Sequence, residues 1–232
     1  MRTLSAPSLK DLIAQMGQQV QRVQNVAPSS EELVDQLEML IERVINGDQR
    51  AVQAYVDKLR LQYPGISNAE LARKIVHRKS LKCGLIGAVT SSGGLITLPF
   101  AIPVDIAGTW RFQINMVVCI AYIFGHTTQT TDLKTDMFLI MAGDSAKEAL
   151  KQFGVAVSKD VTRRLVDKYV TREVMVQINK VVGRKIITKA GEKSLTSFTK
   201  MVPLVGMPVG FAFDWSATKA VGHTAIRCYS GG

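Results

Sequence analysis

The sequence has 232 residues, with 29 Lys and Arg against 19 Asp and Glu, which gives a net charge of +10. Hydrophobic residues make up 47% of the chain, charged residues make up 21%, and the mean hydropathy is +0.12. This composition is too apolar for a disordered chain and too polar for a transporter with many membrane spans, so it predicts a globular or membrane-bound protein.

The cysteines and the N-terminus bear on the cellular compartment. Cys83, Cys119 and Cys228 are an odd number at wide spacing, which fits neither a disulfide scaffold nor a zinc knuckle. Residues 1–10 lack an apolar segment behind Arg2, so no secretory signal is predicted there. We therefore expect a cytoplasmic protein that needs no metal or other cofactor.

The first elements follow from capping and periodicity. Residues 1–28 are rich in Gln and Ser and predict a flexible arm. Residues 29–63 predict an N-terminal helical hairpin, because Ser29 and Glu32 form a capping box and apolar residues then repeat at helical spacing as far as Pro64. The remaining residues, 64–232, are expected to form one further helical domain.

That second domain is expected to open with a short helix and a long uncharged segment. Ser67 and Glu70 form another capping box, and a basic helix should follow as far as Lys82. From Cys83 to Val104 there are 22 residues without a charge, the length at which a membrane span must be considered. Its glycines and prolines lower helix propensity, so we expect a re-entrant or tightly packed helical hairpin in its place.

The rest of the chain is also predicted to be helical. Asp105–Phe124 and Asp132–Ala142 form apolar helices, residues 143–199 are basic and amphipathic, and Met201–Phe213 is a second apolar segment broken by Gly and Pro. Residues 146–232 carry a net charge of +9. The predicted fold class is an all-α, multi-helix bundle with two Gly/Pro-interrupted apolar helical hairpins.

A pseudo-repeat links the two apolar segments. In each, the apolar run ends at an aspartate, Asp105 or Asp214, and a threonine follows four residues later on the same helix face. Arg111 lies in an otherwise apolar helix and would need a counter-charge if buried. We hypothesise that Arg111 pairs with Asp214. Asp105 begins its predicted helix and could cap it. Asp105, Arg111 and Asp214 are therefore candidates for a buried polar group.

Several short motifs resemble the EcsC family of bacterial proteins. They are Pro64-Gly65-Ile66 with Glu70-Leu71-Ala72, the run from Gly84 to Ala88 with Gly93-Gly94, Pro103-Val104-Asp105, and the run from Val202 to Gly206. The resemblance covers about residues 64–227 and leaves the first 63 residues outside. It implies a helical, membrane-associated protein connected with an ABC-transporter operon, and it brings no agreed enzymatic activity.

Enzyme motifs are absent from the sequence. The run Gly191-Glu192-Lys193-Ser194 lacks the glycine that a P-loop needs, and neither a nucleophile elbow nor a zinc-protease helix occurs. We therefore expect a non-enzymatic protein that binds an anionic membrane surface or lipid from the cytoplasmic side. A membrane-transport protein is a further candidate partner, which the protein would support. Nucleic acid is not an expected partner, because no compact basic recognition motif is evident.

Two sets of residues are predicted to make the membrane contact. The apolar set lies in the two apolar segments: Leu85, Ile86, Leu95, Ile96, Phe100, Leu204, Val205 and Phe211. The basic set, for the anionic surface, lies in the basic amphipathic region: Lys159, Arg163, Arg164, Lys168, Arg184 and Lys185.

Two alternatives remain open. The apolar segments could enclose a cavity for an apolar ligand in a soluble carrier, or the chain could be a hydrolase with a site around Asp105 and Asp214. A solvated basic helix face over an ordinary core would leave no membrane role at all.

Overall fold

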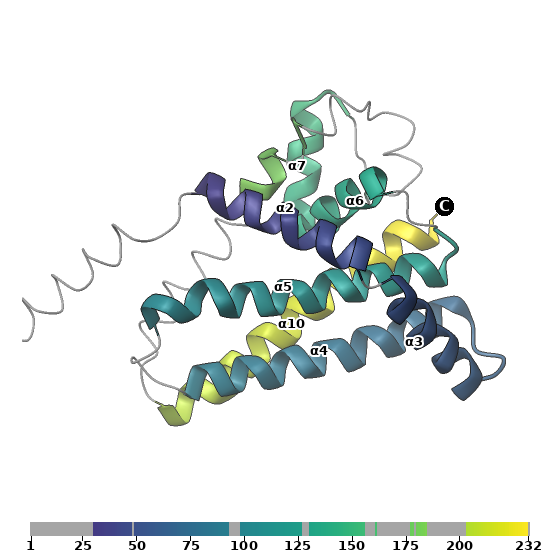
Figure 1. Cartoon of the computed structure of the whole chain (residues 1–232), viewed down its shortest axis with the longest axis horizontal. Helices are drawn as coiled ribbons and strands as arrows, with labels where there is room; N and C mark the ends of the chain where they lie inside the picture. The colour runs from purple at the N-terminus through teal and green to yellow at the C-terminus, as the bar shows by residue number, and fades with distance from the viewer. Residues whose placement is uncertain are drawn as a thin grey trace, which may run out of the picture.

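The computed structural model describes residues 30–47, 49–92, 98–126, 130–155, 161, 177–178, 180–184 and 203–231. The secondary structure of these residues is helical, and the predicted all-α bundle is confirmed. Three long helices, α4 (Asn68–Ser92), α5 (Leu98–Ile123) and α10 (Pro203–Ser230), pack side by side (Figure 1).

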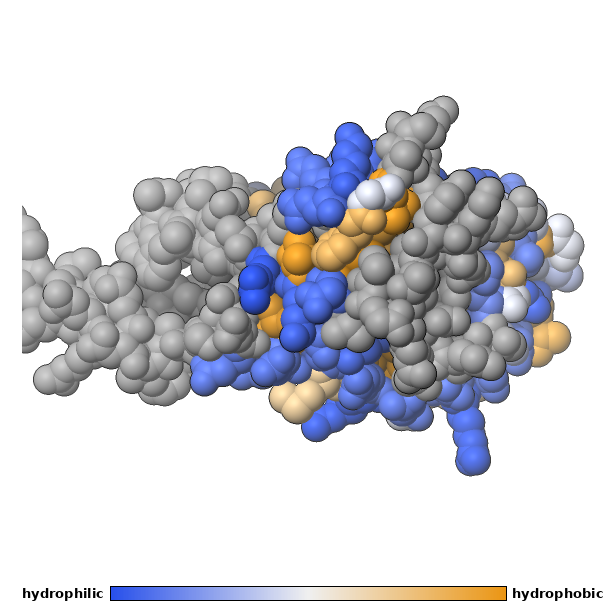
Figure 2. All heavy atoms as spheres, turned by 90° about the horizontal axis from the view of Figure 1, so that it is seen from above, coloured by the Kyte–Doolittle hydropathy of each residue, from blue (hydrophilic) through white to orange (hydrophobic). Residues whose placement is uncertain are grey.

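Shorter helices cover this group of three. Helices α2 (Ser30–Gly47), α6 (Thr130–Ala142) and α7 (Asp144–Gln152) lie above it in Figure 1, and α3 (Gln49–Gln62) packs near the end of α5. Figure 2 shows the face on the side of α2 and α7, where hydrophilic residues predominate and hydrophobic areas show between them.

The predicted apolar stripes of α2 and α3 are buried. Leu37 and Ile41 in α2, and Val52, Val56 and Leu59 in α3, all have exposed fractions of 3% or less. Their spacing of three and four residues places each set on one helix face. These side chains belong to the same core cluster as those of α5 and α6, so the core extends across the boundary predicted at residue 63.

Ionic and polar contacts fix the outer helices. Lys134 of α6 pairs with Glu38 and Glu42 of α2, with Nζ–O distances of 2.8 Å each. Arg60 of α3 donates a hydrogen bond to the carbonyl of Ile123, at the C-terminal end of α5. This bond satisfies one of the carbonyls that a helix leaves without an internal partner.

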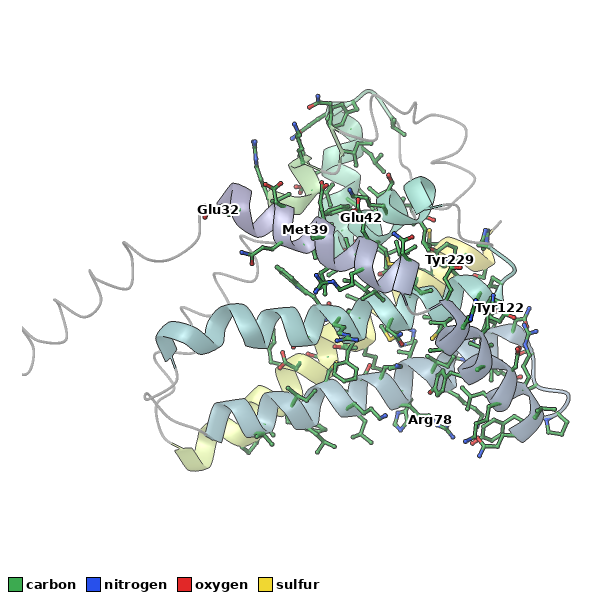
Figure 3. All side chains as sticks on the ribbon, in the orientation of Figure 1. Glu32, Met39, Glu42, Arg78, Tyr122 and Tyr229 are labelled. Carbon is green, nitrogen blue, oxygen red and sulfur yellow. The ribbon has the colours of Figure 1, made fainter. Side chains whose placement is uncertain are left out.

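The start of α4 has the capping box predicted from the sequence. The Ser67 hydroxyl donates to Glu70 Oε2 at 2.7 Å, and the Glu70 N–H donates to Ser67 Oγ at 3.3 Å. These bonds to Ser67 lower the pKa of the Glu70 carboxyl. Arg78, labelled in Figure 3, donates to the Tyr63 hydroxyl and ties the preceding turn to α4.

The apolar segments are more continuously helical than predicted. Helix α4 continues beyond Lys82 to Ser92, and α5 begins at Leu98, before the expected start at Asp105. Pro99 is tolerated there because the first turn of a helix has N–H groups without partners. Residues 203–213 form the first turns of the single helix α10, which contains Pro208.

Glycines allow α4 and α10 to approach closely along an antiparallel interface. A Cβ added at Gly222 of α10 would lie 2.5 Å from Val76, and one added at Gly84 of α4 would lie 2.9 Å from the Phe211 ring. Gly84, in the first apolar segment, is therefore a packing residue here. Tertiary contact outweighs its low helix propensity.

The C-terminal end of α10 is held to α6 and to the end of α5. The hydroxyl of Tyr229, labelled in Figure 3, donates to Asp136 Oδ2 at 3.2 Å, and both residues are buried. The ring of His126 lies 4.9 Å from the Tyr229 ring, and its Nε2 lies 3.3 Å from the Tyr229 carbonyl oxygen.

Candidate functional site

The two apolar segments of the sequence meet at one end of the long helices. The C-terminal half of α4, the start of α5 and the start of α10 lie together at the left of Figure 1. Gly84 faces Phe211 and Gly87 faces Gly210, which sets the alignment of α4 against α10. Segments more than a hundred residues apart in sequence therefore build a single surface.

An exposed apolar patch lies on this end. Leu81, Leu85 and Val89 follow one another at intervals of four along α4, with exposed fractions of 42%, 55% and 68%, and Phe213 of α10 is 46% exposed. We call these four residues the apolar patch. The other large hydrophobic residues exposed in the described ranges, Met39 and Leu61, lie on α2 and α3.

Basic side chains lie on α4 and α10 nearer the opposite end of these two helices. Arg73 and His77 precede Leu81 at the same four-residue interval and are exposed, while Lys219, His223 and Arg227 follow one another on α10. We call these five residues the basic patch. Residues four apart lie on one helix face, so α4 changes from basic to apolar along one face, whereas Phe213 lies six residues before Lys219 and on another side of α10.

The basic residues of the two helices are close enough to interact electrostatically. The pKa of His223 is lowered by partial burial and by the positive charges of Lys219 and Arg227 on its own helix and of Arg73 on α4. The Lys219 ammonium lies 4.6 Å from the centre of the Trp215 ring. Trp215 thus lies between the apolar and basic parts of α10.

Polar residues are buried under this surface. Asp214 is 3% exposed and lies so close to the backbone of α4 that a Cβ at Gly87 would overlap its carboxylate. Thr218, one turn later, is fully buried and accepts a hydrogen bond from Gln113 of α5 at 3.3 Å. Asp214 and Thr218 share the buried side of α10, so neither lines an open cleft.

The predicted polar group is only partly assembled. Arg111 is exposed and therefore does not need a buried counter-charge, whereas Asp214 is buried. Asp105 lies within α5, beyond its first turn, and its side chain is outside the described part of the structure.

The apolar residues predicted to contact the membrane differ in how exposed they are. Leu85 is exposed, and Ile86 and Phe211 are half-buried. Phe100, Leu204 and Val205 lie in the first turns of α5 and α10, without described side chains. Leu95 and Ile96 lie outside the described residues.

The basic set predicted from the sequence lies mostly beyond the described ranges. Arg184 is exposed on a short helical segment. The other members are outside the described residues: Lys159, Arg163, Arg164, Lys168 and Lys185.

Sequence reasoning missed three members of the apolar patch. Leu81, Val89 and Phe213 are exposed although they belong to apolar runs. The signal was the four-residue interval from Arg73 through His77, Leu81 and Leu85 to Val89, which is visible only if α4 is taken as one helix. Ending that helix at Lys82 hid the pattern.

Two further properties concern the described residues. None of their helices combines the length and apolar character needed to cross a bilayer. Their His, Cys, Asp and Glu side chains form no group of three suited to a metal ion.

Comparison with known proteins gives one match. The family model described as the EcsC protein family matches residues 7–230. The match includes most of the first 63 residues, so the sequence-based expectation that they lie outside the family was wrong. No curated protein and no solved structure matches the chain.

Proposed function

The chain belongs to the EcsC protein family, and we propose that it is a non-enzymatic protein that binds peripherally to the cytoplasmic face of an anionic membrane. The apolar patch would enter the interface between lipid headgroups and acyl chains. Support of a neighbouring membrane-transport protein would follow from this location.

The observation that carries the proposal is the exposure of the apolar patch. Three exposed aliphatic side chains are in line on one face of α4, and Phe213 is exposed on α10 near the same end of the long helices. Clustered exposed apolar residues mark interaction sites more often than single ones do. Apolar area with adjacent basic charge is the combination that interfacial helices use.

The alternatives have less support in the described residues. A hollow between α6, α7 and the end of α10 holds about 20 Å³, which is room for about one water molecule and not for a lipid chain. A hydrolase would need Asp214 and Thr218 in contact with substrate, and both are buried.

Vesicle flotation tests the proposal with paired leucine variants. The double variant Leu81→Ser and Leu85→Ser should bind vesicles of phosphatidylcholine and phosphatidylglycerol at least about tenfold more weakly, because each leucine loses a favourable transfer of about 1.5 kcal/mol or more. Its free energy of unfolding should change little, because both side chains are already exposed in the free protein.

Leu61→Ser is the matched control. Leu61 is 84% exposed on α3, outside the apolar patch, so its replacement should leave vesicle binding unchanged. Equal loss of binding in the control and the double variant, or no binding of the wild type at low salt, would contradict the proposal.

A further inference from the structure

The basic patch continues the line of exposed apolar residues along α4, and its other members lie on the neighbouring helix α10. On α4 the order is Arg73, His77, Leu81 and Leu85, each four residues after the last. On α10, which runs antiparallel, Phe213 comes first and Lys219 and His223 follow. The apolar ends of both helices therefore lie together, and so do their basic ends.

Arg73 and Lys219 form no close ion pair within the described ranges. No carboxylate in the described ranges lies within 4 Å of the Arg73 or Lys219 side chains. The Glu70 carboxylate interacts electrostatically with Arg73, but its hydrogen bonds are to Ser67, where it caps α4. Arg73 and Lys219 are thus available to an anion from outside.

We infer that Arg73, Lys219 and His223 bind the phosphate groups of an anionic bilayer while the apolar patch enters it, so that α4 and α10 lie along the membrane surface. This inference rests on the proposed function and adds the residues that contact the lipid phosphates and the orientation. The position of Trp215 fits it, because Trp is favoured at the boundary between headgroups and acyl chains. Trp215 lies between Phe213 and Lys219, where that boundary would be.

The surroundings of His223 add a pH dependence to this binding. Its pKa is lowered by partial burial and by the positive charges of Lys219, Arg227 and Arg73, all of which disfavour the protonated ring. The other histidine of the basic patch, His77, lies on α4, and α7 contributes Asp144 and Lys147, which line the same hollow as Arg227. Lipid phosphates would reverse the sign of this field and favour the protonated ring. Binding should therefore strengthen at acid pH, as the pH falls through the lowered pKa of His223 and the ring gains its proton.

Charge variants of the full chain test the inference. Arg73→Gln and Lys219→Gln should each weaken binding to phosphatidylcholine vesicles that contain phosphatidylglycerol by roughly fivefold, and the double variant by roughly 25-fold. Lys58→Gln, on the exposed side of α3, removes the same charge and should have little effect. His223→Gln should abolish the strengthening at acid pH, and wild-type binding should weaken with salt.

The outcomes separate this inference from the proposed function. If the wild type binds neutral and anionic vesicles equally and only the Leu81 and Leu85 changes weaken binding, the inference is overturned, and the proposed peripheral membrane binding through the apolar patch stands without its preference for anionic lipid. Equal effects of Lys58→Gln and Arg73→Gln would also overturn the inference. Binding to an oligonucleotide that requires Arg73 and Lys219, without vesicle binding, would assign this surface to nucleic acid and overturn both.

Discussion

Gly87 and Asp214 show how single residues decide the packing of this molecule. Gly87 lies within an apolar run, and it brings the backbone of α4 against Gly210 and the Asp214 carboxylate. Asp214 in turn is almost fully buried, although carboxylates seldom are. The sequence predicted that Asp214 and Thr218 share a helix face, but it could not predict that this face is buried, because burial depends on the partner helix.

Replacing Gly87 tests this close approach. Gly87→Ala should lower the free energy of unfolding by about 1–3 kcal/mol, because the added methyl group overlaps the Asp214 carboxylate and lies 2.7 Å from the Gly210 carbonyl oxygen. Chemical denaturation measures the change. Gly108→Ala is the control: Gly108 lies in the interior of α5 with nothing near its Cβ position, so this variant should be more stable by up to about 1 kcal/mol.

At the scale of the elements, the sequence predicted best where local signals suffice. The stripes of α2 and α3 and the capping box at Ser67 and Glu70 depend on neighbours within two turns, and all of them are present. The extent of α4 depends on α10, because Gly84 and Gly87 would weaken an isolated helix. For this reason the helix end predicted at Lys82 was wrong. As a consequence, Leu85 was the one member of the apolar patch that was predicted from the sequence.

The contact between α10 and α6 is a second test at this scale. Tyr229→Phe removes a buried hydrogen bond to Asp136 and should cost about 1–3 kcal/mol of stability, because the carboxylate oxygen loses its donor in a site closed to water. Tyr122→Phe, at a half-buried position on α5, should change stability much less. If thermal unfolding of the two variants were alike, the Tyr229 hydroxyl would not contribute as described.

For the molecule as a whole, the long helices form one cooperative unit with two different ends. Their shared core extends into α2, α3 and α6, and the α4–α10 interface is its most extensive helix pair. The all-helical class follows from composition and periodicity. The apolar-to-basic polarity of the surface does not, because it requires the relative alignment of two helices that are distant in sequence.

Native-state hydrogen exchange should reveal this unit. Backbone amides in the middle of α4 and α10 should exchange with similar, high free energies of opening, because neither helix can leave without exposing the other. The short helix α7, which shares fewer buried side chains with the core, should exchange sooner. Fast exchange in α10 together with slow exchange in α4 would contradict a single unit.

The pairing of Val76 with Gly222 also has a consequence during synthesis. A ribosome makes α4 long before α10, so the nascent chain presents the glycine-lined side of α4 with no helix to cover it. Such long-range pairing raises the contact order and delays the final folding step. Until α10 arrives, that uncovered side is available to chaperones and to other unfinished chains.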